Sequence, residues 1–489
     1  MSKQPSSTEL EAGANPYIWL TGLISGGALF VMTLVLPAPE NMPVAAWQCA
    51  GLALMMAVFW SMEILPISVT ALLPLLLAPL VGLLSLDKVA SAYAHPVIYL
   101  FMGGFMLGLA MERWNLHRRI ALLTMLASGT GERRQVIGFM LTTAFISMWV
   151  SNTATAIMML PIGMSVIAMM KEERGSHGHF PAALLLAIAY GASIGGFGTL
   201  IGTPPNALLA AFLSEQYGIE IGFAQWMLVG MPATLLMLLV TGWWLSSGGY
   251  ELRPGENESV RLSLKEQLAE MGSLSRAEKW VAVIFTTTAL CWVFRPWLSG
   301  FLPDIKLTDT AIALTGGLLM FIIPVRWGEK LDFLLNWKDI RRLPWDVLLL
   351  FGGGLSLAAI IRKTGLAEWI ASNFQVLDGL PTIAAIALVV SVIIFLTEIT
   401  SNTATTAAFL PPLGALAVSL GLDPEVLAIP AAIAASCAFM LPVATPPNAI
   451  VFGSGLLSIR QMIRSGLILN LAGIVIITVL CALLVDRVF

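Results

Sequence analysis

The chain has 489 residues, of which 57% are hydrophobic and only 11% are charged, whereas about 25% of the residues of a soluble domain are charged. This composition excludes an ordinary water-soluble enzyme. The net charge of -3 says little about partners, but no basic patch is interleaved with aromatic residues, so nucleic-acid binding is not supported. Four cysteines lie far apart in apolar stretches and form no CxxC pair, so neither a disulfide framework nor a zinc site is predicted.

Apolar stretches long enough to cross a bilayer recur along the whole chain. Because a transmembrane helix needs about 20 mainly apolar residues, we predict an all-α polytopic membrane protein with about eleven transmembrane helices. The predicted windows are 17–36, 44–62, 64–85, 96–112, 182–212, 225–247, 280–300, 309–325, 345–361, 426–456 and 464–486. No small-residue cleavage site follows the first window, which is therefore interpreted as a retained helix.

Two further apolar stretches, 135–170 and 381–420, are each interrupted by a polar Ser-Asn-Thr. We interpret both as re-entrant helical hairpins that enter and leave on one side. With a cytoplasmic N-terminus, this topology leaves only six basic residues outside: Lys88, Arg295, Lys306, Arg362, Lys363 and Arg487. The strong inward bias of the remaining Lys and Arg agrees with the positive-inside rule.

The predicted organisation consists of two similar halves joined by a short hydrophilic segment. We expect a cytoplasmic tail (1–16), first-half scaffold helices (17–134), first-half transport elements (135–248), a cytoplasmic linker (249–279), second-half scaffold helices (280–380) and second-half transport elements with the last helix (381–489). The linker is too short to form a separate catalytic or regulatory domain.

An internal repeat supports this division. At an offset of 250 residues, Ser-Asn-Thr-Ala-Thr at 151–155 matches the same five residues at 401–405, and Phe145 matches Phe395. At an offset of 242, Thr-Pro-Pro-Asn at 203–206 matches 445–448. In the predicted topology the two copies have opposite orientations, which is typical of secondary transporters whose substrate and ions bind near the membrane midplane.

The repeated motifs place hydroxyls, amides and free carbonyls within apolar sequence. Pro-Pro cannot continue a helix, so windows 182–212 and 426–456 must unwind near their middle, which frees carbonyls and exposes a helix N-terminus. A simple proline kink, and Ser, Asn and Thr acting only as contacts between helices, are the alternatives. Ser147 and Thr397 lie four residues before each tip serine and share its helical face.

No Arg, Lys or His lies within these motifs, so an anion would have to be held by hydroxyls, amides, helix termini and bound cations. Glu398 is the acid in the motifs, and we expect it, like Glu63, to have a structural or helix-capping role. All four histidines are predicted in loops, which argues against a buried proton relay. Glycines 103, 104, 353 and 354 are predicted to permit close helix packing.

The run from Ser436 to Val451, together with the paired Ser-Asn-Thr motifs, resembles the signature of the divalent anion/sodium symporter family. This family includes sodium-coupled carriers of dicarboxylates, citrate and sulfate, and the resemblance covers nearly the whole chain. It implies a homodimer in which each protomer has a scaffold domain and a transport domain that moves as an elevator.

The resemblance also implies site residues. One sodium site would be lined by Ser147, Ser151, Asn152 and Gly202, and a second by Thr397, Thr400, Asn402 and Ala444. The substrate carboxylates would face Asn152, Thr153, Thr203, Asn402, Thr403, Thr445 and Pro446. At position 400 the resemblance leaves open whether the hydroxyl or the backbone carbonyl is the ligand.

The sequence thus predicts a transporter, not an enzyme, in the bacterial inner membrane, importing C4-dicarboxylates such as succinate, malate and fumarate with two or more sodium ions. The absence of a soluble domain between the halves favours dicarboxylates, because some sulfate carriers insert regulatory domains there. A sodium-independent dicarboxylate exchanger, and a sodium-coupled carrier of citrate or sulfate, remain alternatives. A channel would lack saturable counterflow, and an intramembrane hydrolase would need a buried Ser-His or aspartate pair.

Overall fold

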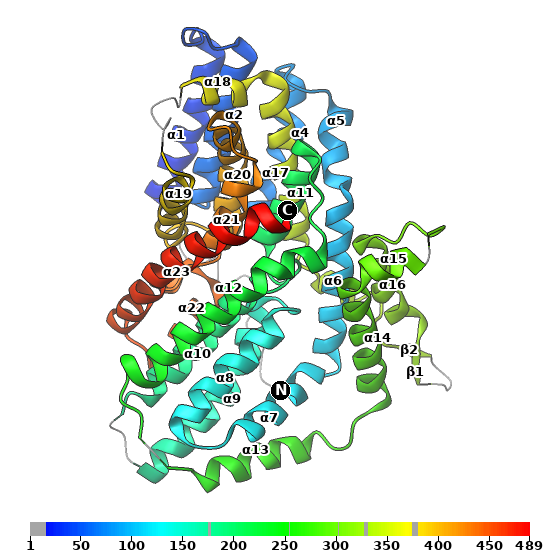
Figure 1. Ribbon diagram of the computed structural model, residues 1–489, viewed down its shortest axis with the longest axis vertical. Coiled ribbons are helices and arrows are strands. Elements are labelled where there is room, and N and C mark those ends of the chain that lie inside the picture. Colours follow the sequence, from blue (N-terminus) through cyan, green and yellow to red (C-terminus); the bar gives the residue numbers. More distant parts are fainter. Residues whose placement is uncertain (1–15, 175–177, 254, 302, 327–330, 374–379) are drawn as a thin grey trace.

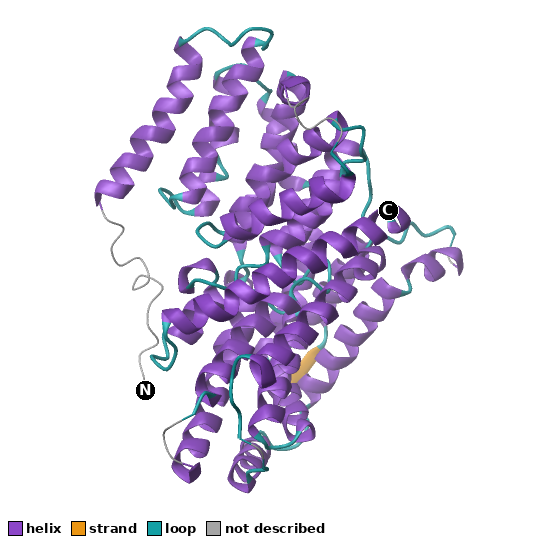
Figure 2. Ribbon diagram, turned by 60° about the vertical axis from the view of Figure 1, so that its left-hand side comes forward, coloured by secondary structure: helices purple, strands orange, loops and turns teal. Residues whose placement is uncertain are grey.

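The computed structural model describes residues 16–174, 178–253, 255–301, 303–326, 331–373 and 380–489. This part of the chain is almost entirely helical (Figures 1 and 2), which confirms the predicted all-α class. One small antiparallel sheet pairs β1 (Pro324–Arg326) with β2 (Asp332–Phe333). The predicted N-terminal tail lies almost wholly outside the described residues.

The helices follow one another with short connections. The first half contains α1 (Pro16–Val35), α2 (Val44–Ser61), α3 (Ile67–Thr70), α4 (Leu73–Leu80), α5 (Leu86–Ser91), η2 (Ala92–Ala94), α6 (Pro96–Arg113), α7 (Leu116–Ser128), α8 (Glu132–Ser147), α9 (Asn152–Arg174), α10 (Phe180–Gly195), α11 (Pro204–Tyr217), α12 (Phe223–Trp243) and a π-helical turn, η3 (Trp244–Gly248). The linker and second half contain α13 (Glu258–Glu270), α14 (Arg276–Val293), α15 (Arg295–Phe301), α16 (Asp309–Ile322), η4 (Asp339–Arg342), α17 (Trp345–Thr364), α18 (Leu366–Asn373), α19 (Thr382–Thr397), α20 (Asn402–Ser419), α21 (Glu425–Ala435), η6 (Pro442–Ala444), α22 (Pro446–Phe452) and α23 (Ile459–Val488).

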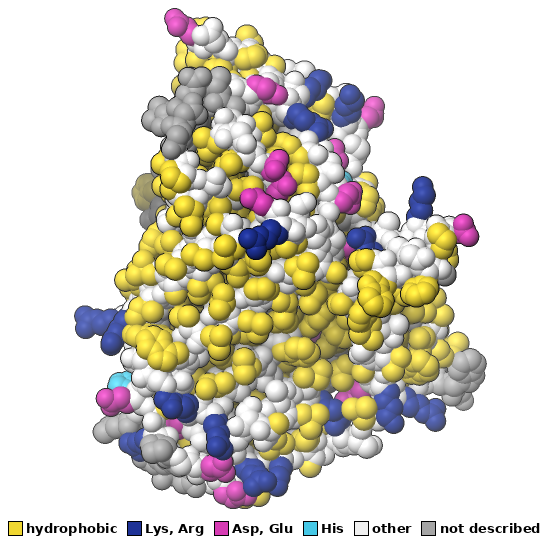
Figure 3. All heavy atoms as spheres, in the orientation of Figure 1, with side chains coloured by type: hydrophobic (Ala, Val, Ile, Leu, Met, Phe, Trp, Pro, Cys, Tyr) yellow, Lys and Arg dark blue, Asp and Glu magenta, His cyan; other side chains and the backbone are white. Residues whose placement is uncertain are grey.

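The number of full-length membrane helices is lower than predicted. Among the described residues, six helices are long and apolar enough to cross a membrane, or seven if one bent pair counts as a single span. Hydrophobic side chains nevertheless fill the middle of the face in Figure 3, and Lys and Arg gather along its lower rim. The chain is therefore a multi-pass membrane protein in which several apolar segments are short or broken.

Three predicted windows differ from single straight helices. Window 64–85 is shorter than predicted, because it contains only α3 and α4, which together form a short apolar helix from Ile67 to Leu80 with a two-residue turn between them. Window 280–300 bends by 80° between α14 and α15, where Pro296 follows the break. In window 309–325, α16 has only 14 residues, about 21 Å at 1.5 Å per residue.

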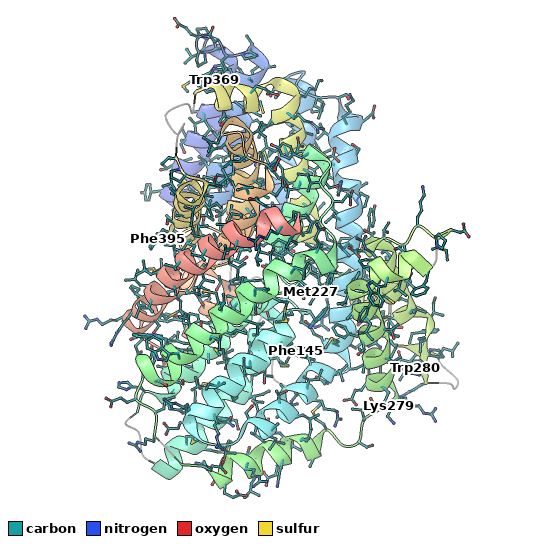
Figure 4. All side chains as sticks on the ribbon, in the orientation of Figure 1. Phe145, Met227, Lys279, Trp280, Trp369 and Phe395 are labelled. Atoms are coloured by element: carbon teal, nitrogen blue, oxygen red, sulfur yellow. The ribbon has the colours of Figure 1, made fainter. Side chains whose placement is uncertain are left out.

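The two interrupted stretches form the predicted helix-turn-helix hairpins. In the first, α8 and α9 are joined through residues 148–151, and in the second α19 and α20 are joined through residues 398–401. Phe145 on α8 and Phe395 on α19, matched in the repeat, lie on opposite sides of the pair α12 and α23 in the view of Figure 4.

The two Thr-Pro-Pro-Asn motifs break helices as predicted. The chain leaves helical geometry between α10 and α11 and again between α21 and α22, and each new helix begins at the first proline of the motif. Proline suits this place, because the first turn of a helix does not use its backbone N–H groups. The breaks are thus irregular segments that comprise residues 196–203 and 436–445. Each is longer than the interruption that a simple proline kink would produce.

The halves pack against each other through α6 and α16, through α12 and α23, and also through these broken elements. Helix α9 of the first hairpin contacts α22, and α20 of the second hairpin contacts α11. Helices α12 and α23 run side by side across the centre in Figure 1, while α14, α16 and the sheet lie at one side, next to α6. Each hairpin therefore contacts the broken helix of the opposite half as well as that of its own half.

Close helix packing depends on glycine at several contacts. A Cβ on Gly195 of α10 would lie 2.2 Å from the carbonyl oxygen of Ala144 on α8, and one on Gly103 would lie 2.6 Å from that of Ala313. A Cβ on Gly353 would lie 2.5 Å from the carbonyl oxygen of Ala71. The predicted packing role is confirmed for glycines 103 and 353, whereas Gly354 has room for a Cβ, with its nearest neighbour at 3.5 Å.

Ion pairs tie the linker and part of the second half to the first half. Arg119 of α7 pairs with Glu278 of α14 at 2.6 Å, and Arg113 pairs with Asp339 at 2.5 Å. The pKa of the Asp332 carboxyl, in β2, is held below its usual range by a hydrogen bond from Asn336 and by the nearby Arg113 guanidinium. The linker is thus integrated into the fold.

One histidine does not lie where we predicted. His117 is in α7 rather than in a loop and is buried, with Nδ1 2.9 Å from the carbonyl oxygen of Met111. His95 directly precedes α6, and His179 directly precedes α10, whereas His177 lies outside the described residues. The loop prediction missed α7 because its many polar residues hide a short amphipathic helix.

Candidate functional site

Each hairpin turns within four residues, and its polar motif forms the turn. Helix α8 ends at Ser147 and α9 starts at Asn152, and the backbone N–H of Ala154 donates to Ser151 Oγ at 3.3 Å. Helix α19 ends at Thr397 and α20 starts at Asn402. Ser, Asn and Thr favour such places because their short polar side chains satisfy the free N–H groups of a helix start.

Three oxygen atoms converge at the first tip. Ser147 Oγ lies 2.7 Å from Asn152 Oδ1 and 2.7 Å from the carbonyl oxygen of Ala192 on α10. Ser147 is fully buried, and its single hydroxyl hydrogen cannot satisfy both neighbours at once. The cluster therefore presents more lone pairs than hydrogens, which is an environment that suits a cation.

The second tip repeats this arrangement. Thr397 Oγ1 lies 2.8 Å from Asn402 Oδ1 and 2.8 Å from the carbonyl oxygen of Ala435 at the end of α21. Thr397 is also fully buried. The repeat seen in the sequence is thus preserved at the level of individual oxygen atoms.

The asparagine of each Thr-Pro-Pro-Asn motif clamps its break. Asn206 Nδ2 donates to the carbonyl oxygens of Gly196 and Thr199 at 3.0 and 2.8 Å. Asn448 Nδ2 donates to the equivalent carbonyls of Ala438 and Leu441 at 3.1 and 3.0 Å. The sequence analysis missed this role, although the motif itself carried the signal.

The first tip and the first break meet at Gly196. A Cβ there would lie 3.2 Å from Asn152 Oδ1 and 3.0 Å from Thr203 Cβ, and a Cβ on Gly202 would lie 2.6 Å from the carbonyl oxygen of Gly196. The structure therefore brings Ser147, Asn152, Gly202 and Thr203 together as the sequence predicted. Only glycine leaves room for this contact between two irregular backbones.

The other predicted residues differ in accessibility. Thr203, Ala444 and Thr445 are buried, residues 152, 153, 402 and 403 are half-buried, and Ser151 and Pro446 are exposed. Thr445 caps α22, because its Oγ1 accepts from the backbone N–H of Asn448. Thr400 directs its hydroxyl to the carbonyl oxygen of Leu396 and to Thr405 Oγ1, at 2.9 and 2.6 Å. The Thr400 hydroxyl is therefore already hydrogen-bonded within the hairpin, whether or not it also contacts a cation.

Neutral oxygens dominate the chemistry of the tips. Within the described part of the chain, no group of three or more His, Cys, Asp or Glu side chains could hold a metal ion. Glu398 lies beside the second tip, where backbone N–H groups surround it, and this agrees with the structural role expected for it. Glu63 is exposed after the end of α2 and lies outside both tips. Neutral hydroxyl, amide and carbonyl oxygens suit a hard cation better than a transition metal.

Aromatic residues enclose the first tip. The Trp149 ring lies 6.1 Å from that of Phe223 on α12 and 5.1 Å from that of Phe285 on α14. Ile399, the residue matched to Trp149 in the repeat, is 68% exposed. The first tip is thus packed against its neighbours and the second is open on one side.

A separate cavity of about 210 Å³ lies away from the tips, between α11, α17, α18 and α20. Its lining includes Phe212, Arg362 and Pro411. None of the residues that line the cavity belongs to the Ser-Asn-Thr or Thr-Pro-Pro-Asn motifs, so the cavity is distinct from the candidate site.

Repeated hairpins and broken helices that meet at buried oxygen clusters define a multi-pass membrane transporter. A family model described as "Sodium:sulfate symporter transmembrane region" matches residues 19–486. The chain belongs to this family, as the sequence motifs had suggested.

Curated relatives support the assignment over nearly the full length. The "Sodium-dependent dicarboxylate transporter SdcS" of Staphylococcus saprophyticus is 40% identical over 482 residues, which cover 96% of this chain and 92% of that protein. The protein of the same name from Staphylococcus aureus is 40% identical over 465 residues, which cover 94% and 89%.

Solved structures show that the fold occurs more widely. The Neisseria gonorrhoeae MtrF structure, described as illuminating a class of antimetabolite efflux pumps, aligns with a TM-score of 0.63 at 14% identity and covers 98% of this chain and 97% of that one. The Alcanivorax borkumensis YdaH transporter aligns with a TM-score of 0.53 at 14% identity, covering 96% and 97%. At this identity the similarity concerns the fold alone.

Proposed function

We propose that this protein is a secondary transporter that couples the inward movement of sodium ions to the uptake of C4-dicarboxylates such as succinate, malate and fumarate. Curated relatives that are 40% identical over almost the whole chain carry the name sodium-dependent dicarboxylate transporter. The paired oxygen clusters carry the proposal, because two equivalent cation environments are what coupling to two or more sodium ions requires.

Each tip holds one sodium ion in this proposal. Ser147, Ser151, Asn152 and Gly202 surround the first ion, and the Ala192 carbonyl oxygen, 2.7 Å from Ser147 Oγ, adds a further oxygen. Thr397, Thr400, Asn402 and Ala444 surround the second, and the Ala435 carbonyl oxygen takes the equivalent place. Asn152, Thr153, Thr203, Asn402, Thr403, Thr445 and Pro446 face the substrate carboxylates.

Charge explains why transport would be coupled. The substrate carries two negative charges, and no Lys, Arg or His lies within the four motifs. The helices α9, α11, α20 and α22 begin at the tips and breaks, but a helix N-terminus stabilises a nearby anion by only about 0.3–1 kcal/mol. Bound sodium ions supply the remaining compensation, so the substrate binds well only after the ions.

The finer features of the proposal follow the family resemblance. The hairpins and broken helices form a transport domain that moves as an elevator against a scaffold, and two protomers assemble as a homodimer. The protein lies in the bacterial inner membrane with its N-terminus in the cytoplasm, consistent with the Lys and Arg along the lower rim in Figure 3.

The decisive experiment is uptake of radiolabelled succinate into proteoliposomes, with and without an inward sodium gradient. Excess malate, citrate and sulfate are added as competitors, and choline chloride replaces sodium chloride in the control. We expect accumulation that requires sodium and is blocked by malate but only weakly by citrate or sulfate.

Two other outcomes select the alternatives. Uptake that ignores sodium but requires dicarboxylate inside the liposomes identifies an exchanger. The family description names sulfate, so sodium-dependent uptake of labelled sulfate that exceeds uptake of succinate identifies a sulfate carrier.

A further inference from the structure

The cavity between α11, α17, α18 and α20, in the upper part of Figure 1, has a mainly apolar wall. The side chains that line it include Phe212, Ala358, Ile361, Pro411 and Ala415. Its volume of about 210 Å³ exceeds the roughly 150 Å³ that is enough to hold a benzene molecule. The cavity therefore has room for an aromatic or branched apolar group and a few further atoms.

Two aromatic rings of α11 form one side of the cavity. Phe212 and Tyr217 meet edge to face, with their ring centroids 5.7 Å apart and their planes at 77°. Gly414 of α20 leaves space for both, because a Cβ there would lie 2.7 Å from the Tyr217 hydroxyl oxygen and 2.9 Å from Phe212 Cζ. The ring of a ligand can pack against this pair in the offset or edge-to-face arrangements that aromatic groups prefer.

Polar side chains line the same cavity next to the apolar wall. They are Gln216 and Tyr217 of α11, Arg362 of α17 and Glu368 of α18. Within the part of the chain that the structure describes, the buried Nε2 atom of Gln216 has no hydrogen-bond acceptor. A buried donor without an acceptor is unfavourable. An occupant that brings an acceptor, such as a carboxylate, is therefore stabilised here.

The two charged side chains of the cavity are not paired with each other. Arg362 Nη1 donates to the carbonyl oxygens of Glu215 and Gln216 at 3.0 and 3.1 Å. These bonds hold the guanidinium at the C-terminal end of α11 and use one of its three nitrogen atoms. Among the described residues, neither Arg362 nor Glu368 forms an ion pair. The cavity thus joins an apolar wall to one unpaired positive charge and one unpaired negative charge.

This combination fits a zwitterionic amino acid with a large apolar side chain. Its carboxylate pairs with Arg362 and accepts from Gln216 Nε2, its ammonium group pairs with Glu368, and its side chain fills the apolar space. A dicarboxylate fits poorly, because it brings a second negative charge toward Glu368 and no apolar group. An apolar monocarboxylate would leave Glu368 without a partner.

The position of the cavity suggests what a bound molecule would do. Helices α17 and α18 belong to the predicted scaffold, whereas α11 and α20 belong to the predicted transport elements, so an occupant contacts both groups. We propose that the cavity binds an amino acid with a large apolar side chain, and that the bound molecule restrains the sliding of these groups and slows dicarboxylate uptake. The binding is independent of the proposed function, whereas the effect on uptake rests on it.

Binding is tested by thermal unfolding of the purified protein in detergent, without dicarboxylate, at increasing concentrations of L-phenylalanine. A ligand that binds only the folded state raises the midpoint temperature. Three compounds that each lack one recognised group serve as comparisons: 3-phenylpropionate lacks the ammonium group, phenethylamine lacks the carboxylate, and glycine lacks the apolar side chain. We expect a saturable rise with phenylalanine and a much smaller rise with each of the others.

Variants of the cavity assign the binding to it. Ala415→Leu fills the cavity from α20 and should abolish the response to phenylalanine. Glu368→Gln should raise the half-saturating concentration of phenylalanine about threefold, in line with the modest strength of an exposed ion pair, and should lower that of 3-phenylpropionate. Because Glu368 is exposed, this variant serves if Ala415→Leu does not fold. The matched control is Glu266→Gln, an exposed acid on α13, which should respond like the wild type.

The effect on transport is measured in proteoliposomes with L-phenylalanine on both sides of the membrane. The maximal rate of sodium-dependent succinate uptake should fall while the KM for succinate stays unchanged, because the cavity is separate from the candidate site. Uptake by Ala415→Leu should not respond to phenylalanine. Inhibition that excess succinate reverses overturns the restraining role.

The remaining outcomes separate the two proposals. No rise of the midpoint temperature with phenylalanine, an equal rise with glycine, or an unchanged response in both Ala415→Leu and Glu368→Gln overturns the inference and leaves the proposed function intact. A protein that phenylalanine stabilises in the expected way, but that does not take up succinate with or without sodium, overturns the proposed function and leaves the binding site in place.

Discussion

At the residue scale, two asparagines have the same task in opposite halves. Asn152 and Asn402 begin helices α9 and α20, and each places Oδ1 within 2.8 Å of a buried hydroxyl. Alanine at either position removes an oxygen from a cluster and leaves the backbone path unchanged. We expect Asn152→Ala and Asn402→Ala each to reduce succinate uptake to the level of empty liposomes while size-exclusion profiles stay unchanged.

A control for these variants is available in the loop beside the sheet. Asn336→Ala removes the same chemical group from a position whose side chain contacts Asp332, far along the chain from both tips. It should retain most of the uptake. Transport that persists in both tip variants contradicts the site assignment.

The clamping asparagines lead to a second prediction at this scale. Asn206 and Asn448 are fully buried, and each holds two carbonyl groups across a break. Replacing either by alanine leaves those carbonyls without a donor, at a cost of about 1–3 kcal/mol. We expect a lower midpoint of thermal unfolding in detergent, together with a large loss of uptake.

Asn448→Asp provides the matched comparison, because aspartate keeps the size of the side chain but cannot donate. It should destabilise the protein at least as much as alanine does. Unchanged melting in both variants shows that the amide does not hold the break.

The sequence predicted the tips but not the clamps, for a physical reason. A polar triplet in apolar sequence is visible without any structure, and its repetition indicated that it was not incidental. A proline kink and an amide-clamped break contain the same residues in sequence, so the role of Asn206 could not be separated from that of its neighbours. The donors to Glu398 come from residues 41 to 72 positions away, and no local pattern relates them.

At the element scale, helix α10 lies against α8 with almost no space between their backbones. Gly195→Ala would place a Cβ 2.2 Å from the carbonyl oxygen of Ala144, which cannot move without disturbing the first hairpin. Overpacking of this kind costs about 1–3 kcal/mol. We expect less folded protein from membranes and a lower midpoint of thermal unfolding.

Gly354→Ala is the control for this prediction. It makes the same change within α17, where the nearest atom lies 3.5 Å from the new Cβ, on Leu208. It should be neutral or slightly stabilising, because alanine favours helix by about 1 kcal/mol over glycine. Equal behaviour of the two variants contradicts the packing argument.

Element boundaries were predicted best where prolines or polar residues interrupt an apolar stretch in a repeated way. Hydropathy alone counted window 64–85 as one long helix, because an average over about 20 residues does not register a two-residue turn or the end of the helix at Leu80. The structure breaks this window at Ala71, where the chain packs against Gly353. The 80° bend between α14 and α15 escaped prediction in the same way.

At the scale of the whole molecule, each half completes the other. Helix α9 contacts α22 and α20 contacts α11, so neither hairpin has its full set of neighbours within its own half. We expect residues 1–254 and 255–489, expressed separately, to give little folded protein. Coexpression should give two chains that purify together and support sodium-dependent uptake.

This experiment distinguishes interleaved halves from independent ones. A first half that folds alone, with a cooperative melting transition, contradicts the arrangement. A further control coexpresses the halves with Asn402→Ala in the second, which should purify together but not transport. The repeat in the sequence predicted two similar halves, but the contacts between them join residues far apart in the chain, such as those of α9 and α22, and required the structure.

The different ways of holding the two breaks affect how such a protein can change over generations. Where a break is held by closely packed glycine backbone and neutral hydrogen bonds, any larger side chain disturbs several contacts at once, and adjustment is slow. Where it is held by one carboxylate at position 398, a single nucleotide substitution that gives glutamine or aspartate alters the contacts of one break and leaves the other untouched. The two halves of a duplicated ancestor can therefore diverge at the second break without any change in the first.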